Sequence, residues 1–243
     1  MEGHGFSHAA RNDFGIGFSR WGLLANTLLM HEESQMRAYK FLDAHFGLRS
    51  LTEKRLKIST LQDLNDPFEL SPYDLSNPPD RMAMRQYLRE MTARYGLLCF
   101  SSDWKDPVIW AHYGDKHRGI CLGFEIPADK CKTITYVPQR LAFPTSPTKE
   151  DSERILFTKY INWEYEQEVR MWARLNEKDN NLYFASFGED LKLVKVVAGA
   201  RYELSENDIV QALGPLAKNV IVIQARAGLK KFEIVENKQG FAK

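Results

Sequence analysis

The order of hydrophobic and polar residues along the chain predicts many short β-strands. Residues 168–175 (EVRMWARL) alternate between apolar side chains and Arg or Trp, a pattern typical of a strand with one buried face. Residues 96–102 (GLLCFSS) and 119–126 (GICLGFEI) are short apolar runs that begin at glycine, as buried strands often do. Further strands are expected at residues 37–42, 56–59, 133–137, 193–202, 219–225 and 232–235.

Helices are expected where apolar side chains repeat at helical spacing and end signals flank them. Residues 80–93 show this spacing behind Asp80, whose side chain can cap the first turn. Pro107 is suited to the first position of a second helix. Ser205 and Asp208 stand at the spacing of a capping box, with Asp in place of Glu or Gln. The predicted helical segments are 50–54, 80–93, 107–113, 151–160 and the segment from Ser205 to Gly214-Pro215.

These elements predict an α+β fold of mixed, largely antiparallel sheets with flanking helices and roughly seven to ten strands. The chain of 243 residues is long enough to bury one large core. We expect a single α+β domain at residues 36–243. It is preceded by an N-terminal arm or helix at residues 1–35, in which residues 21–30 (WGLLANTLLM) form an apolar stretch.

Charge and composition narrow the function classes. The chain has 33 Lys and Arg against 32 Asp and Glu, which argues against nucleic-acid binding through bulk positive charge. No segment approaches the roughly 20 apolar residues of a membrane span, and residues 1–20 lack the apolar core of a secretory signal. The three cysteines form no C-x-x-C pair. We therefore expect a cytoplasmic protein with free thiols and no association with membranes.

Two polar segments are candidates for contact with a ligand. In Asn65-Asp66-Pro67-Phe68-Glu69, an acidic residue before proline favours a turn. Asp66 then either accepts hydrogen bonds from the backbone of that turn or, with Glu69, faces a ligand. Ser101 follows a buried strand, where its hydroxyl either caps the chain or positions a substrate.

Aromatic residues gather around the predicted helix at 107–113. Trp110 and Tyr113 share one helix face, with His112 between them and His117 shortly after. These rings form either an aromatic core patch or a wall on which a planar ligand stacks. Because five residues separate the two histidines, they are poorly placed to bind a metal from one helix face, and no metal is expected.

A run of alternating glutamates precedes Arg170. In an extended segment Glu164, Glu166 and Glu168 would share one face, where like charges are unfavourable unless they are paired or used. A solvated edge strand is the alternative interpretation. Lys40, between two aromatic residues on an early strand, either points outward or places a cation near a phosphate.

In this order the segments resemble domain of unknown function family 2971, a widespread bacterial family. The resemblance covers about residues 37–200. It implies an accessory, stress or phage-defence setting, in which an antitoxin-like protein is one conceivable partner. The matching segments are Tyr39-Lys40-Phe41, Asn65-Asp66-Pro67-Phe68-Glu69, Leu98-Cys99-Phe100-Ser101, Trp110-x-His112-Tyr113 with His117-x-Gly119, and Glu166-x-Glu168-x-Arg170.

A second resemblance concerns chemistry. A basic residue, a Phe-Ser-Ser strand end and a Glu-x-Glu-Val segment are similar to the R-S-E pattern of ADP-ribosyltransferases, although that superfamily has Arg or His where this chain has Lys40. The resemblance implies that Lys40 and Ser101 hold NAD as the substrate. It also implies that Glu168 is catalytic, that Glu166 assists it, and that rings of the 107–113 segment stack on nicotinamide or adenine. It further implies a split antiparallel sheet pair with these residues in the cleft.

The expected function is therefore ADP-ribosyl transfer to a macromolecular acceptor, or NAD hydrolysis, because a carboxylate can stabilise the positive charge that develops on the ribose. One alternative is a magnesium-dependent nuclease. Another is a non-enzymatic module that binds a ligand or partner through the Trp110–Tyr113 surface. The carboxylates available to a nuclease are Asp66, Glu69, Glu166 and Glu168.

Overall fold

The computed structural model describes residues 34–176 and 178–241, without the side chain of Gln62. The arm or helix expected at residues 1–35 lies almost entirely outside these ranges. The first described strand begins at Gln35. None of the helices in the described ranges combines the length and the apolar character needed to cross a membrane.

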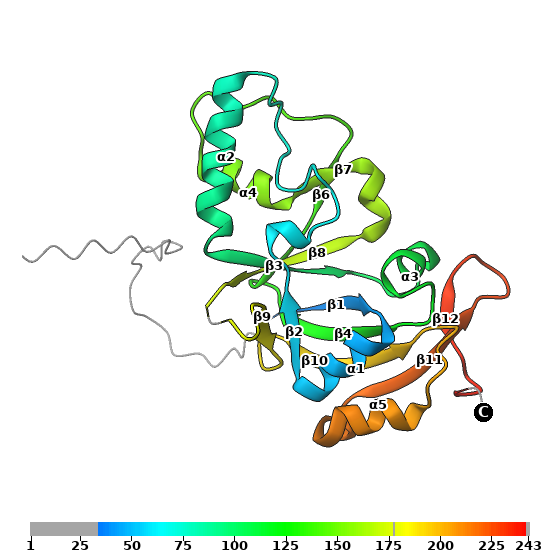
Figure 1. Ribbon diagram of the computed structural model, residues 1–243. Helices are drawn as coiled ribbons and strands as arrows, with labels where there is room; N and C mark the ends of the chain where they lie inside the picture. Colours follow the sequence, from blue (N-terminus) through cyan, green and yellow to red (C-terminus); the bar gives the residue numbers. More distant parts are fainter. Residues whose placement is uncertain (1–33, 177, 242–243) are drawn as a thin grey trace, which may run out of the picture. The chain divides into compact units, whose positions relative to one another are not determined.

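Eight strands form one mostly antiparallel sheet through the middle of the fold (Figure 1). Its only parallel neighbours within the described residues are β10 and β11. The expected fold class is confirmed. In spatial order the strands are β12 (Ile234–Glu236), β11 (Ile221–Ala227), β10 (Lys192–Ala198), β4 (Ile120–Pro127), β1 (Gln35–Leu42), β3 (Tyr95–Ser101), β8 (Glu168–Arg174) and β5 (Cys131–Thr133).

The sheet is nearly divided between β1 and β3. Strand β1 pairs with β4 along its whole length, from Gln35 to Leu42, and β3 pairs with β8 in the same continuous way. By contrast, β1 and β3 are in register only at Tyr39 and Ser101. The two halves of the sheet therefore meet at one residue pair, and the strands are free to diverge on either side of it.

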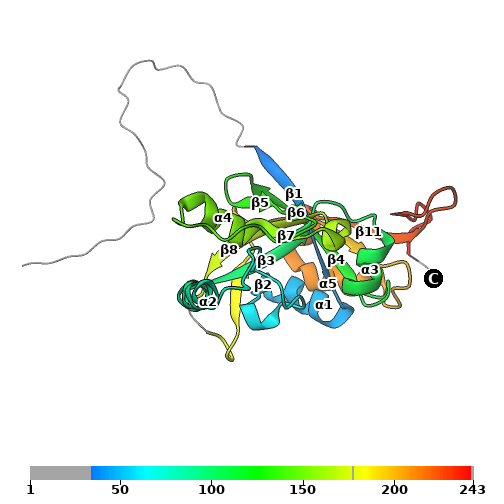
Figure 2. The ribbon, with the colours of Figure 1, turned by 90° about the horizontal axis from the view of Figure 1, so that it is seen from above.

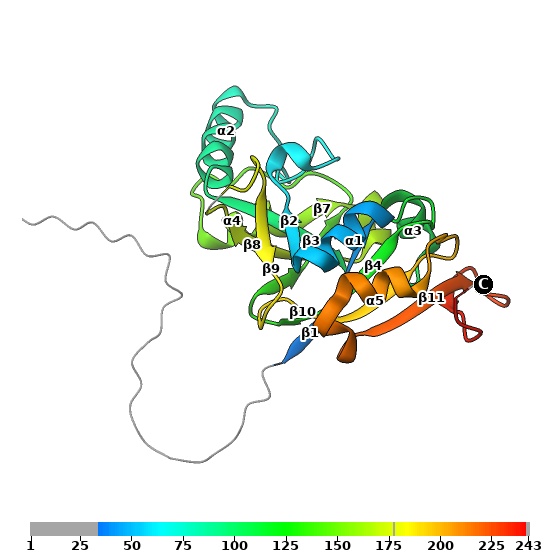
Figure 3. The ribbon, with the colours of Figure 1, turned by 60° about the horizontal axis from the view of Figure 1, so that its bottom comes forward.

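Helices cover the sheet in separate groups. Helices α1 (Ala44–Glu53) and α5 (Glu206–Leu213) lie side by side (Figures 1 and 3). Seen from above, α1 lies on one side of strands β3 and β4, and the small strand β6 lies toward the other (Figure 2). Helix α2 (Pro78–Thr92) contacts β3, and α3 (Pro107–Tyr113) contacts β1. The core of Leu98, Leu122, Val196 and their neighbours lies between the sheet and its helices.

Two small sheets complete the fold: β2 (Arg55–Ile58) with β9 (Tyr183–Ser186), and β6 (Thr135–Val137) with β7 (Thr158–Tyr160). Twelve strands occur within the described residues, more than the seven to ten expected, because three-residue strands carry little sequence pattern. The prediction of a helix at residues 151–160 was wrong at its C-terminal end. Helix α4 (Lys149–Phe157) stops before Thr158, where β-branched and aromatic residues continue as β7.

Candidate functional site

A pocket of about 260 Å³ opens where β1 and β3 diverge. The 39–41 segment of β1 and the 99–101 segment of β3 form two of its sides, and α3 contributes Tyr113. Because the two strands are joined only at Tyr39 and Ser101, their side chains can face a common space. The remaining polar lining comprises Ser59, Asp63, Asn65, Glu69, Lys159, Glu166 and Glu168.

The three residues that the second resemblance singled out line this pocket together. Tyr39 on β1 is in register with Ser101 on β3, and Ser101 is in register with Glu168 on β8. Lys40 Nζ donates to the backbone carbonyl of Cys99 at 3.0 Å, so this side chain spans the gap between the halves of the sheet. Lys40, Ser101 and Glu168 thus come from three adjacent strands and meet at one site.

A buried ion cluster forms the inner wall of the pocket. The ammonium of Lys159 lies 3.0 Å from Glu69 Oε1, 2.6 Å from Glu166 Oε2 and 3.2 Å from Glu168 Oε2. All four residues are buried. Charges removed from water are stable only when they are paired and hydrogen-bonded. The ammonium of Lys159 donates hydrogen bonds to Glu166 and Glu168 and forms a further ion pair with Glu69. These four residues, with Arg170, are called the Lys159 cluster below.

Arg170 binds two carboxylates of the cluster on the side away from the pocket. Its guanidinium is fully buried and contacts Glu168 through Nε at 2.9 Å and Glu69 through Nη2 at 3.0 Å. Its Nη1 donates to the backbone carbonyl of Leu156 at 2.7 Å. Arg170 therefore fixes the positions of two of the three carboxylates, and it does not itself line the pocket.

The pKa values of the two glutamates next to Gln167 are shifted in opposite directions. Burial raises the pKa of Glu168, but the positive charges of Arg170 and Lys159 outweigh burial and hold that pKa at about 2. For Glu166, burial is the largest effect and raises the pKa above its ordinary value, although Lys159 and a hydrogen bond from Tyr113 oppose the rise. Glu168 is thus a permanent anion, whereas Glu166 binds a proton more readily.

The backbone, and not strand alternation, brings these glutamates together. Residues Ile161–Glu166 form a 3-10 helix, and Gln167 adopts a left-handed conformation with φ 44° before β8 begins at Glu168. The expectation of three glutamates on one extended face was therefore wrong. Glu164 is exposed, while Glu166 and Glu168 both reach Lys159.

Tyr113 connects helix α3 to the Lys159 cluster. Its hydroxyl donates to Glu166 Oε1, and Asn65 Nδ2 donates to the same hydroxyl at 3.0 Å. Burial and the neighbouring Glu166 raise the pKa of Tyr113, so the phenol stays protonated and acts as a donor. Asn65, Tyr113 and Glu166 therefore form a continuous hydrogen-bonded chain along the pocket.

The other aromatic residues of this segment do not form the expected stacking wall. Trp110 has no exposed surface; its indole N–H donates to the Trp104 carbonyl at 2.6 Å and its ring contacts Phe41 edge-on. His117 stacks on the same indole with ring centroids 6.3 Å apart. His112 is exposed and lies outside the pocket lining. Trp110 and His117 thus belong to the core patch, and only Tyr113 lines the pocket.

The carboxylates considered for magnesium have other partners. Asp66 accepts the backbone N–H of Phe68 at 2.9 Å, which is the turn-forming role weighed for it. Glu69, Glu166 and Glu168 surround the ammonium of Lys159. In the described part of the chain, His, Cys, Asp and Glu side chains do not assemble into a group of three or more suited to a metal ion.

Lys159 is the central residue that sequence reasoning missed. It was expected inside a helix, and a single lysine carries no local sign of burial. The one available signal in the sequence was the excess of negative charge, since three glutamates buried near one ligand site need a positively charged partner. Cys99 also lines the pocket, where burial and the nearby Glu168 raise the pKa of its thiol to about 12 and leave it protonated.

Comparison with known proteins identified no relative of this chain. No protein-family model matches the chain, and searches of curated proteins and of solved structures returned no match. Membership of family 2971 therefore stays a prediction from the matching segments, and the site is interpreted from its geometry alone.

Proposed function

We propose that the pocket between β1 and β3 binds NAD and breaks its nicotinamide–ribose bond, with transfer of the ADP-ribosyl group to an acceptor or to water. The observation that carries the proposal is the meeting of Lys40, Ser101 and Glu168 on adjacent strands at the point where the sheet divides. This is the arrangement that the resemblance to ADP-ribosyltransferases implies.

The charges of the site suit a positively charged reacting group. In the Lys159 cluster three carboxylates face two cations, so one negative charge is in excess when all are ionised. NAD carries a positive pyridinium ring, and the positive charge moves to the ribose as the bond breaks. An excess of negative charge beside the reacting carbon favours that transition state. Lys40 forms no salt bridge with any described carboxylate and is free to meet a phosphate.

The two glutamates take separate roles in this proposal. The C1′–N bond breaks, its electron pair leaves with nicotinamide, and Glu168 as a permanent anion stabilises the cationic ribose. Glu166 accepts the proton of the attacking water or acceptor hydroxyl, a role suited to a carboxylate with a raised pKa. Tyr113 orients Glu166 through its hydrogen bond.

The pocket is smaller than the roughly 300–1,000 Å³ of sites that enclose a whole drug-sized ligand. We therefore expect the nicotinamide riboside half of NAD to enter, while the adenosine half lies outside the pocket.

The test is release of nicotinamide from NAD by the purified chain, with labelled NAD to follow transfer to protein or nucleic acid. Glu166→Gln and Glu168→Gln should each lower release at least about 100-fold, in line with loss of a general base or of charge stabilisation. Glu189→Gln is the control, because Glu189 is exposed in a turn. Thermal unfolding of each variant shows whether the fold is retained.

Two results would contradict the proposal. One is undiminished release by folded Glu168→Gln. The other is the absence of both release and a thermal shift by NAD, which would favour a module that binds some other ligand. Strict dependence on magnesium with DNA or RNA as substrate would favour the nuclease.

A further inference from the structure

A second cavity of about 280 Å³ lies on the other side of β7 from the Lys159 cluster. Thr158 and Tyr160 line it from that strand, and the 137–140 segment and the 68–72 loop form the opposite sides. Its side chains differ in kind from those of the first pocket. Two exposed aromatic rings, Phe68 and Tyr160, stand beside Arg140, Pro72 and Pro138. We call this cavity the Phe68 groove.

The turn at Asp66 is what presents Phe68 to this groove. Asp66 accepts the N–H of Phe68 through its side chain at 2.9 Å and the N–H of Glu69 through its backbone carbonyl at 3.1 Å. The turn sends Glu69 into the Lys159 cluster and leaves Phe68 with 59% of its surface exposed. A phenylalanine this exposed contributes little to the core, so its place at a cavity suggests contact with a ligand.

Hydrogen bonds to the backbone fix the guanidinium of Arg140 at the same groove. Its Nη1 donates to the backbone carbonyls of Ser71 at 3.0 Å and Tyr73 at 2.6 Å. These bonds hold the guanidinium over one face of the Phe68 ring, 5.2 Å from the ring centroid, so a base would stack on the other face. Of the five N–H donors of arginine, those on Nε and Nη2 form no hydrogen bond with the described residues. Arg140 forms no salt bridge with the described residues either. Hydrogen bonds from Ser76 and, to a smaller extent, the charge of Arg140 lower the pKa of exposed Asp74.

We propose that the Phe68 groove binds a nucleoside monophosphate, with the base stacked on Phe68 and the phosphate held by Nε and Nη2 of Arg140. An aromatic face binds any base through stacking, and a guanidinium with two free edges suits a phosphate in a bidentate way. Tyr160, which is 45% exposed, closes the other side of the base. The ligand is either a free nucleotide or the phosphorylated end of a nucleic acid.

The proposal does not rest on cleavage of NAD. The Phe68 groove and the first pocket share Lys159 in their linings, but Thr158 and Tyr160 face the groove while the ammonium of Lys159 points into the cluster. Binding in the groove can therefore be measured, and can fail, independently of any activity in the first pocket.

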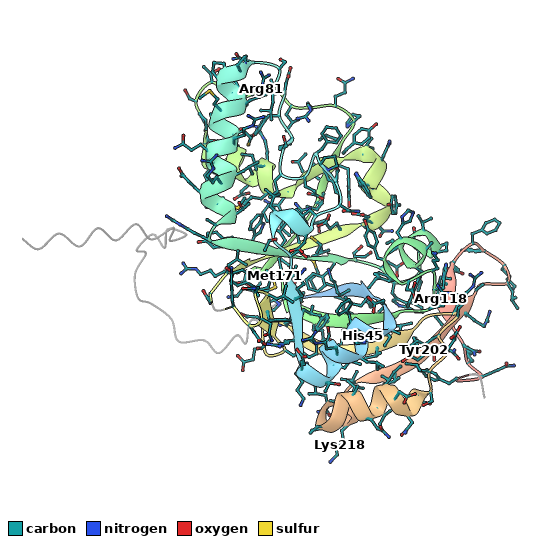
Figure 4. All side chains as sticks on the ribbon, viewed as in Figure 1. His45, Arg81, Arg118, Met171, Tyr202 and Lys218 are labelled. Carbon is teal, nitrogen blue, oxygen red and sulfur yellow. The ribbon has the colours of Figure 1, made fainter. Side chains whose placement is uncertain are left out.

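The experiment is titration of the full chain with AMP and with UMP by calorimetry or NMR. Phe68→Ala and Arg140→Met should each weaken binding about five-fold or more, because stacking on one aromatic ring and a charged phosphate contact are each worth at least that factor. Both side chains are exposed, so their replacement should leave the fold intact. Arg118→Ala is the control: Arg118 is an exposed arginine in the turn after α3 (Figure 4).

Adenosine and inorganic phosphate, tested separately, should each bind more weakly than AMP. A 5′-phosphorylated tetranucleotide distinguishes the two sources of the ligand. If the tetranucleotide binds more tightly than AMP, and Phe68→Ala and Arg140→Met both lose this binding, the groove is assigned to the end of a nucleic acid. If the tetranucleotide and AMP bind equally well, the groove is assigned to free nucleotides. The proposal is overturned if AMP and UMP fail to bind at about 1 mM, or if their binding is lost in Lys40→Met but kept in Phe68→Ala and Arg140→Met.

Discussion

Lys159 Nζ lies 2.6 Å from Glu166 Oε2, and this buried contact joins β7 to the turn that precedes β8. The same ammonium also holds Glu69, which follows the turn at Asp66. Glu69 and the segment at residues 159–168, which are far apart in the sequence, thus meet at one cation. Any ligand in the pocket between β1 and β3 would lie beside these charges, because Lys159 and its three carboxylate partners all line that pocket.

Removal of this cation should be strongly destabilising. Lys159→Met leaves Glu69 and Glu168 paired with Arg170 alone, and it removes the one ion pair that Glu166 forms with the described residues. We therefore expect the free energy of unfolding to fall by about 3–5 kcal/mol. Urea unfolding at neutral pH measures the loss. The control is Lys132→Met, which breaks an exposed pair with Glu153 at 2.7 Å and should cost about 0–1 kcal/mol. A small loss from both variants would contradict a cluster that depends on Lys159.

Glu168 should make the fold sensitive to acid. Its pKa falls from 4.5 to about 2 on folding, so the folded state binds this proton less tightly than the unfolded state. The contribution, about 3 kcal/mol, is present above pH 4.5 and is lost as the pH falls toward 2. Urea midpoints between pH 6 and 2.5 should therefore decline less steeply in Glu168→Gln than in the parent chain.

Glu166 should act on the same curve in the opposite sense. Because the pKa of Glu166 is raised on folding, this residue stabilises the folded state at low pH and destabilises it at high pH. It therefore offsets part of the stability that Glu168 causes the fold to lose in acid. Glu166→Gln removes this offset, and its midpoints should decline more steeply with acid than those of the parent chain. Parallel curves for all three proteins would show that these two carboxylates do not control acid stability.

The turn after α3 packs against the end of β10 with no room for a side chain. A Cβ on Gly199 would lie 2.2 Å from the carbonyl oxygen of His117, whereas a Cβ on Gly188 would meet nothing within 4 Å. Gly199→Ala should therefore lower stability by about 1–3 kcal/mol or more through steric overlap. Gly188→Ala should change the thermal midpoint little. Equal midpoints for the two variants would contradict the close approach of these segments.

Tyr113 and His112 are neighbours with different expected effects. Tyr113→Phe removes the donor to Glu166 and the acceptor of Asn65 within a partly buried chain, and should cost about 1–2 kcal/mol. His112→Ala alters an exposed side chain and should cost less than about 0.5 kcal/mol. If NAD is cleaved, Tyr113→Phe should also shift the pH profile of the rate, because the proton affinity of Glu166 changes. An unchanged profile would leave Tyr113 with a structural role only.

Much of the fold was predictable because its signals are local. Pro107 begins α3, and the Ser205–Asp208 capping box begins α5 with the reciprocal hydrogen bonds expected of it. The apolar runs that predicted β3 and β4 are the buried strands at the centre of the sheet. In each case the side chains that define the element lie within a few residues of one another, so the pattern is complete in one short segment.

The chemistry of the site was only partly predictable for the opposite reason. Patterns of residue types selected Glu166, Glu168 and Arg170. They did not select Lys159, the cation that lies between the glutamates, because its burial results from the pairing of β7 with β6. Trp110 was selected for its chemistry, yet it lies in the core, since the register of β1 and the packing of α3 turn its ring toward Phe41.

By itself, then, the sequence determined the elements, the fold class and a set of polar residues with the potential for chemistry, because propensity, periodicity and capping act within a few residues. The tertiary structure alone decided which of those residues share a pocket and in which direction the pKa values of Glu166 and Glu168 shift. Two ion pairs of the Lys159 cluster, Lys159–Glu69 and Arg170–Glu69, join residues that are remote in the chain. Their energies depend on burial that exists only once the strands have paired.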